Sequence, residues 1–211
     1  MKGGDLYEKW AILGVVAAVI VGVLLIGKYQ DQKYPIPPDG STLLEEATHW
    51  LSRGGNAWVK GKITLYDSVD LGEHRYVLME VKDQLGMLYL EKGPNGNYRM
   101  AGSGYGSGNF HFEELEENRQ RYVLLGGKNT YFGIASMEFE MDHKTYPVEI
   151  PAGDRFLTLV EIDLPLDPNA PLRHVELDTI RFYDADGQDI TDQIPWNGIR
   201  PWDGSSSVTQ K

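Results

Sequence analysis

The chain has 211 residues, with 31 acidic and 20 basic residues, a formal net charge of −11 and no cysteine. The absence of cysteine excludes disulfides, thiolate metal sites and thiol nucleophiles within the chain. The negative net charge disfavours non-specific binding to nucleic acids, and the length is suited to one or two domains.

The first element along the chain is an uncharged apolar segment, Trp10–Gly27. Its 18 residues would rise about 27 Å as a helix, close to the hydrocarbon thickness of a bilayer. Tyr7, Trp10 and Tyr29 flank it, as aromatic residues flank spanning helices. We predict a transmembrane helix over 10–27. A buried core helix and a cleaved signal peptide are the alternatives, but the apolar core of a signal peptide is usually shorter, about 7–15 residues.

The charges on the two sides of this segment are nearly balanced, because Lys2 and Lys9 precede it while Lys28 and Lys33 follow it. We predict that residues 1–9 form a short cytoplasmic tail and that the C-terminal part is extracytoplasmic. This orientation depends on the proline-rich stretch and the cysteine-free, β-rich region that come after the apolar segment.

Small residues recur at every fourth position of the apolar segment, at Gly14, Ala18 and Gly22. This spacing puts them on one helix face and lets two helices approach closely. It indicates a homodimer contact, although glycine and alanine are also common in spanning helices for no such reason.

Residues 28–40 contain Pro35, Pro37 and Pro38, which favour extended backbone, so we predict a proline-rich stalk. A small α+β domain is expected over 41–104. It would begin with a helix over 42–52, because Thr42 to Glu45 forms a capping-box pattern and two glycines end the apolar periodicity. Four strand-like runs follow, at 62–66, 75–81, 85–90 and 98–101.

Residues 105–120 are predicted to form a linker. The glycines of GSGYGSG over 102–108 have the wrong spacing for a phosphate loop. The glutamates that follow, Glu113, Glu114, Glu116 and Glu117, are typical of a solvated surface.

A β-sandwich-like domain is expected over 121–200, followed by a flexible tail over 201–211, because short apolar runs alternate there with turn signals. These runs lie at 122–125, 134–141, 145–150, 156–162, 179–183 and 188–190. The overall expectation is an N-terminal transmembrane helix followed by a mainly β ectodomain.

Four segments carry a resemblance to a known group of proteins: Arg121–Gly133 (RYVLLGGKNTYFG), Tyr146–Asp163, Ile180–Ile190 and Tyr76–Gly106. Together they resemble a group of uncharacterised, single-span exported proteins of Gram-positive spore-forming bacteria. The resemblance covers most of the expected ectodomain and implies its location and architecture. It implies no activity and no functional residue.

Motifs of hydrolases, zinc proteases and phosphate-binding loops do not occur in the sequence, and its five histidines are scattered. The stretch from Asp184 to Asp189 (DADGQD) has acidic residues at alternate positions, which would suit calcium. A two-residue Asp-Gly hairpin turn explains the same residues and is favoured. No catalytic, cofactor-binding or metal-binding residue is assigned.

The C-terminal region repeats a Pro-Trp turn, once at Trp196 and again at Trp202. The favoured interpretation is a tail that buries its tryptophans on the sandwich. The alternative is an exposed aromatic pair that binds a sugar or a partner protein, so Trp196 and Trp202 are the candidate partner-binding residues.

We expect the protein to be a membrane-anchored extracytoplasmic interaction or scaffold module without catalytic activity. The alternative is a small-ligand sensor with a pocket between helix 42–52 and its sheet, lined by Tyr66, Tyr76, Tyr89 and Tyr98. A hydrolase with paired carboxylates is the least favoured reading, because one sequence does not bring two carboxylates together.

Overall fold

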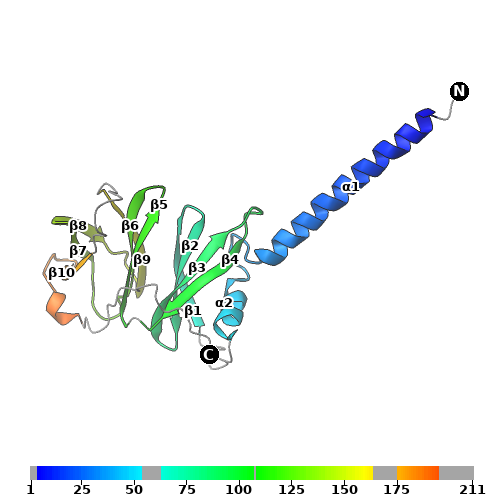
Figure 1. The fold of residues 1–211 in the computed structure, drawn as a ribbon. Helices are drawn as coiled ribbons and strands as arrows, with labels where there is room; N and C mark the ends of the chain where they lie inside the picture. Colours follow the sequence, from blue (N-terminus) through cyan, green and yellow to red (C-terminus); the bar gives the residue numbers. More distant parts are fainter. Residues whose placement is uncertain (1–3, 54–62, 107, 164–174, 195–211) are drawn as a thin grey trace, which may run out of the picture.

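The structure is a computed structural model of the chain and describes residues 4–53, 63–106, 108–163 and 175–194. A long helix, α1 (Gly4–Lys33), is followed by a short one, α2 (Leu43–Leu51), and then by strands (Figure 1). The strands are β1 (Ile63–Leu71), β2 (His74–Val81), β3 (Gln84–Lys92), β4 (Tyr98–Tyr105), β5 (Phe110–Glu117), β6 (Gln120–Lys128), β7 (Ser136–Met141), β8 (Lys144–Glu149), β9 (Arg155–Ile162) and β10 (Glu176–Tyr183). A 3-10 turn, η3 (Thr191–Gln193), ends the described part. The expected fold class, an apolar N-terminal helix followed by antiparallel β sheets, is confirmed.

Helix α1 contains the whole predicted spanning segment and continues beyond it to Lys33. It projects away from the β sheets (Figure 1), and none of its apolar window is buried inside the protein. It is long and apolar enough to cross a membrane, and it is the one helix of this kind among the described residues.

The prediction of an extended stalk over 28–40 is wrong. Residues up to Lys33 are helical, and Tyr34 and Ile36 directly after the helix are 6% and 0% exposed. Ile36 forms an antiparallel bridge with Tyr98 at the start of β4. The backbone is extended around Ile36, where it pairs with the sheet because this apolar residue is buried, and it turns directly afterwards, where the N–H of Gly40 donates to the carbonyl oxygen of Pro37 at 2.9 Å.

Strands β1 to β4 form an antiparallel sheet in sequence order, here called sheet A, and α2 packs on one of its faces. Apolar residues of β2 alternate between the two faces, with Val77 and Met79 towards α2 and Leu78 on the other side. The expected α+β unit is therefore present. The tight turn between β2 and β3 falls on Lys82 and Asp83, which both have positive φ.

Two further antiparallel sheets follow, sheet B with strand order β5-β6-β9 and sheet C with order β10-β7-β8. The predicted linker over 105–120 is wrong, because it contains β5, which pairs along its length with β6. Phe110 and Phe112 alternate with polar residues and point into the core between sheets B and C. In the sequence, the glutamates of β5 resemble a solvated segment, so the alternation of Phe110 and Phe112 with polar residues was not recognised as a strand.

The elements stack in the order α2, sheet A, sheet B, sheet C (Figure 1). Sheets B and C form the expected sandwich, but sheet B is also packed against sheet A. Leu124 of β6 faces sheet A, while its neighbour Leu125 faces sheet C. This double burial explains why β2 and β6 have nearly continuous apolar runs, since both faces of each strand meet another layer.

Candidate functional site

A cleft of about 490 Å³ opens at one end of the interface between sheets A and B. We call it the A/B cleft. Tyr66 and Glu80 line it from sheet A, and Lys128 and Arg155 line it from sheet B. Loop residues Thr130, Tyr131 and Asp154 form part of its rim.

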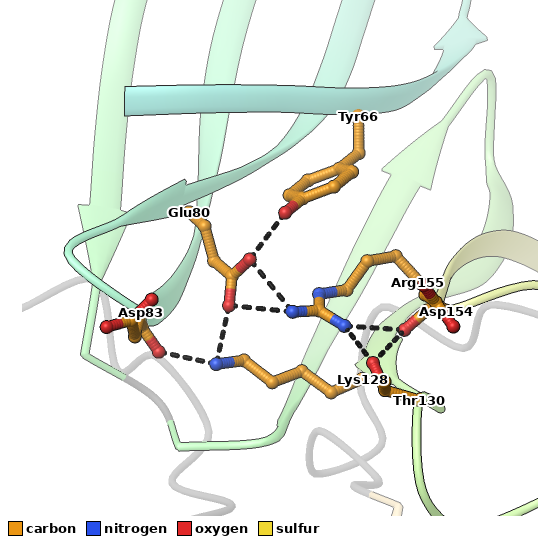
Figure 2. Close-up of polar contacts among 7 residues, drawn as sticks. All are labelled: Tyr66, Glu80, Asp83, Lys128, Thr130, Asp154 and Arg155. Atoms are coloured by element: carbon orange, nitrogen blue, oxygen red, sulfur yellow. Dashed lines mark hydrogen bonds and ion pairs between the residues drawn. The ribbon is translucent and has the colours of Figure 1, made fainter. Parts of the chain in front are cut away.

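Glu80 is the centre of the polar contacts in the A/B cleft (Figure 2). Its carboxylate accepts a hydrogen bond of 2.5 Å from the Tyr66 hydroxyl and two, of 2.9 and 3.0 Å, from Nη2 of Arg155. Nζ of Lys128 lies 2.6 Å from the same carboxylate. The side chain of Glu80 is only 9% exposed, and those of Lys128 and Arg155 are 17% exposed.

These contacts keep Glu80 ionised. Burial alone would raise the pKa of its carboxyl group, but the hydrogen bonds from Lys128, Tyr66 and Arg155 outweigh burial and lower the pKa to about 2. The pKa of Tyr66 is raised, first by burial and then by its hydrogen bond to the Glu80 carboxylate. At neutral pH the cluster therefore contains two cations, one carboxylate and a neutral phenol.

The guanidinium of Arg155 also reaches the loops at the rim of the cleft. Its Nη1 donates to Oγ1 of Thr130 at 2.5 Å and to the carbonyl oxygen of Asp154 at 2.7 Å. Nζ of Lys128 donates to the carbonyl oxygen of Asp83 (Figure 2). Because these groups bind one another, the cluster joins sheets A and B.

Tyr131 stands at the rim of the A/B cleft and is 90% exposed. An exposed aromatic ring beside a polar cleft can stack on the ring of a ligand. The A/B cleft is therefore a candidate binding site for a small polar ligand among the described residues.

The sequence contained a signal for this cluster that the predictions did not use. Glu80 interrupts the apolar run of β2, Lys128 ends that of β6, and Arg155 begins that of β9. A charged residue within or next to a buried strand needs a partner, because an unpaired buried charge is costly. The pairing itself could not be predicted, since Glu80 and Arg155 are 75 positions apart.

The predicted partner-binding residues Trp196 and Trp202 lie outside the described residues. Gly14, Ala18 and Gly22 lie within α1, and, apart from the adjacent residues and the helix backbone, no atom of the described residues lies within 4 Å of a Cβ built on Gly14 or Gly22. The homodimer contact through them stays a prediction.

The aspartate stretch after β10 forms a turn, as favoured, but its two central residues are Ala185 and Asp186 and not the predicted Asp186 and Gly187, because the N–H of Gly187 donates to the carbonyl oxygen of Asp184 at 3.0 Å. Oδ1 of Asp184 accepts hydrogen bonds from the backbone N–H groups of Asp186 and Gln188, at 3.0 and 2.9 Å. Gly187 has a positive φ of 75°, and Tyr183 bridges Asp189. One carboxylate oxygen of the stretch is thus already bound by the turn.

The four tyrosines proposed for a sensor pocket are not gathered in one place. Tyr98 belongs to the apolar cluster between α2 and sheet A, where Ala47 and Met79 are fully buried. Tyr76 and Tyr89 face sheet B instead. Tyr66 lies in the A/B cleft, so the space under α2 is occupied by packed apolar side chains rather than by these four rings.

The glutamates of β5 do not all lie on a solvated surface. The side chain of Glu113 is 13% exposed and accepts a hydrogen bond of 2.8 Å from the Tyr89 hydroxyl. His111, which is 6% exposed, lies 3.3 Å from the same carboxylate oxygen. Glu114 accepts from Arg121 and from the backbone N–H of Val175. The prediction of a purely solvated cluster is wrong because sheet B, which contains β5, lies between sheets A and C.

Comparison of the chain with models of protein families, with curated proteins and with solved structures found no match.

Proposed function

We propose that this protein is a single-span membrane protein whose β stack is a non-catalytic interaction or scaffold module on the extracytoplasmic side. The observation that carries the proposal is the surface of α1. The large apolar residues from Leu13 to Ile26 are each more than half exposed, and no other part of the described chain covers them. Exposure of an apolar surface of this length to water is unfavourable, and the hydrocarbon core of a bilayer would bury it.

The extracytoplasmic location is supported by sequence features. The chain has no cysteine, the β stack follows the helix, and the segments quoted above resemble exported single-span proteins. The flanking lysines are balanced and favour neither orientation.

The non-catalytic role is supported by the polar groups between the sheets. Glu80, Lys128 and Arg155 bind one another, and Glu113 binds Tyr89, so these buried charged and phenolic groups hold layers together. A small-ligand sensor would have to use the A/B cleft, because apolar side chains occupy the space between α2 and sheet A.

Membrane fractionation of the full chain tests the proposal. We expect the protein to stay in the membrane after an alkaline carbonate wash, and the variant Val16→Arg/Ile20→Arg to be released or degraded. Each arginine at the centre of a spanning helix costs about 2.5–3.5 kcal/mol on insertion scales. A matched control, Val16→Leu/Ile20→Leu, should behave as the wild type.

Protease added to intact cells then reports the orientation. We expect digestion of the β stack without disruption of the membrane. Release of the wild-type chain by carbonate would contradict the membrane anchor. Protection of the stack until the membrane is broken would contradict the extracytoplasmic location.

A further inference from the structure

The junction between α1 and sheet A is a packed contact. The ring of Tyr34 lies against Gly93 in the β3–β4 turn, where an added Cβ would come within 2.4 Å of the ring. Two backbone hydrogen bonds join Ile36 and Tyr98, at 2.9 and 2.7 Å. Figure 1 shows the β3–β4 turn beside the C-terminal end of α1. The helix therefore holds the β stack in a fixed position instead of tethering it loosely.

One contact shows how far along α1 the β3–β4 turn reaches. Nδ2 of Asn95, in this turn, donates to Oδ1 of Asp31 at 3.0 Å. Asp31 comes four residues after Gly27, the end of the uncharged segment. Four helical residues correspond to a rise of about 6 Å along the helix axis. The headgroup region on each side of a bilayer is roughly 5–7 Å thick. The turn thus lies at the depth of the lipid headgroups when α1 spans the membrane.

Charges of both signs lie at this end of the stack, with a small excess of positive charge. Four cations lie there, Lys28, Lys33, Lys92 and Arg99, together with two carboxylates, Asp31 and Glu91. Glu73, whose carbonyl oxygen accepts from the N–H of Lys92, adds a third carboxylate from the neighbouring β1–β2 turn. Asp70, which interacts electrostatically with Lys92, is paired with Arg75 and adds one charge of each sign. The local excess of positive charge is therefore small, in contrast to the net charge of −11 of the whole chain.

Two of these cations are arranged around Tyr34. Nζ of Lys33 and the guanidinium carbon of Arg99 each lie 5.4 Å from the centre of its ring. Arg99 also binds Glu91 at 2.5 Å, with its side chain 39% exposed. Lys92 is exposed at the end of β3. The positive groups are thus held at the edge of the junction, where they face the depth assigned to the headgroups.

We propose that this surface, formed by Lys28, Lys33, Lys92, Asn95 and Arg99 and here called the collar, binds anionic phospholipid headgroups of the bilayer that α1 spans. The inference rests on the proposed function, because it requires α1 to be in a membrane. It adds that the β stack lies on the lipid surface, with the β3–β4 turn among the headgroups and sheet C directed away from them.

The absence of cysteine allows a direct test by single labels on the full chain. Pro94→Cys, in the β3–β4 turn, would carry an environment-sensitive fluorophore after reconstitution into vesicles of phosphatidylglycerol and phosphatidylcholine. We expect a headgroup-attached quencher to quench this label several-fold more than the same label at Asp186→Cys, in the exposed turn after β10. Equal quenching at the two positions would overturn the inference.

A label at Leu24→Cys separates this inference from the proposed function. Quenching of that label by a quencher attached deep in the acyl chains shows that α1 is in the bilayer. If Leu24→Cys is quenched and Pro94→Cys is not, the collar inference fails while the anchor stands. If Leu24→Cys is not quenched, the membrane anchor itself fails.

Charge dependence is tested with Lys33→Gln/Lys92→Gln in the Pro94→Cys background. When the headgroup quencher is carried by phosphatidylglycerol, we expect its quenching of the label to fall by at least half, both in this variant and at high salt, because less anionic lipid gathers at the collar. When the quencher is carried by phosphatidylcholine, the variant and its parent should agree, because α1 sets the depth of the turn. Quenching by the labelled phosphatidylglycerol that is independent of salt and of both lysines would overturn the role of anionic lipid.

Discussion

Replacing Glu80 with alanine is expected to destabilise the β stack by about 3–5 kcal/mol, because it leaves Lys128 and Arg155 partly buried without their shared carboxylate. The Tyr66 hydroxyl loses its acceptor at the same time. Urea denaturation of the full chain in detergent, followed by tyrosine and tryptophan fluorescence, would measure the change. Glu91→Ala is the matched control, because its pair with Arg99 is exposed and worth at most about 1 kcal/mol.

The destabilisation caused by Glu80→Ala should decrease as the pH is lowered. Glu80 has a pKa of about 2 in the folded protein and 4.5 as its ordinary value, so its ionisation stabilises the fold above about pH 4.5. This contribution, roughly 3 kcal/mol from the pKa difference, is lost as the pH falls towards 2. The gap between the wild type and Glu80→Ala should therefore narrow over that range. If Glu80→Ala lowers the free energy of unfolding at pH 7 by no more than Glu91→Ala does, the cluster does not join the sheets.

Leu124→Ala and Leu125→Ala are each expected to cost about 2–5 kcal/mol, although the two side chains point in opposite directions. Leu124 is fully buried towards sheet A, and Leu125 is 1% exposed towards sheet C. In an ordinary two-sheet sandwich, one of two successive residues would face solvent and tolerate truncation. The pair of measurements therefore tests the three-sheet stack.

Leu44→Ala is the control for this pair, since Leu44 is 51% exposed on the outer face of α2. We expect it to cost less than about 1 kcal/mol. A cost for Leu124→Ala that is no larger than that of Leu44→Ala would contradict the packing of sheet A on sheet B.

The elements that could be predicted from the sequence are those with a local signal. An uncharged run of helix-forming length specifies α1, and the apolar spacing and terminal glycines specify α2. Most strands follow from alternation between turn signals. Strand β5 was missed because its glutamates resemble a solvated segment, although Phe110 and Phe112 keep the two-residue period of a strand.

The features that could not be predicted depend on contacts between distant segments. The prolines after α1 indicate extended backbone, but whether that backbone is free or paired depends on Tyr98, more than 60 positions away from Ile36. The cluster around Glu80 likewise needs side chains from three separate strands and a fourth contact from β1. Burial of β6 on both faces follows only from the stacking of three sheets.

The rigid connection between the helix and the β stack is tested most directly by a distance measured between spin labels in a bilayer. Leu24→Cys and Asp186→Cys, in α1 and in the turn after β10, would be labelled in one full-length chain and measured by pulsed electron paramagnetic resonance. We expect a single distance distribution about as narrow as that of a reference pair within the stack, Pro94→Cys and Asp186→Cys. A distribution several-fold broader than the reference would show a flexible stalk and would contradict the fixed position of the β stack at the membrane.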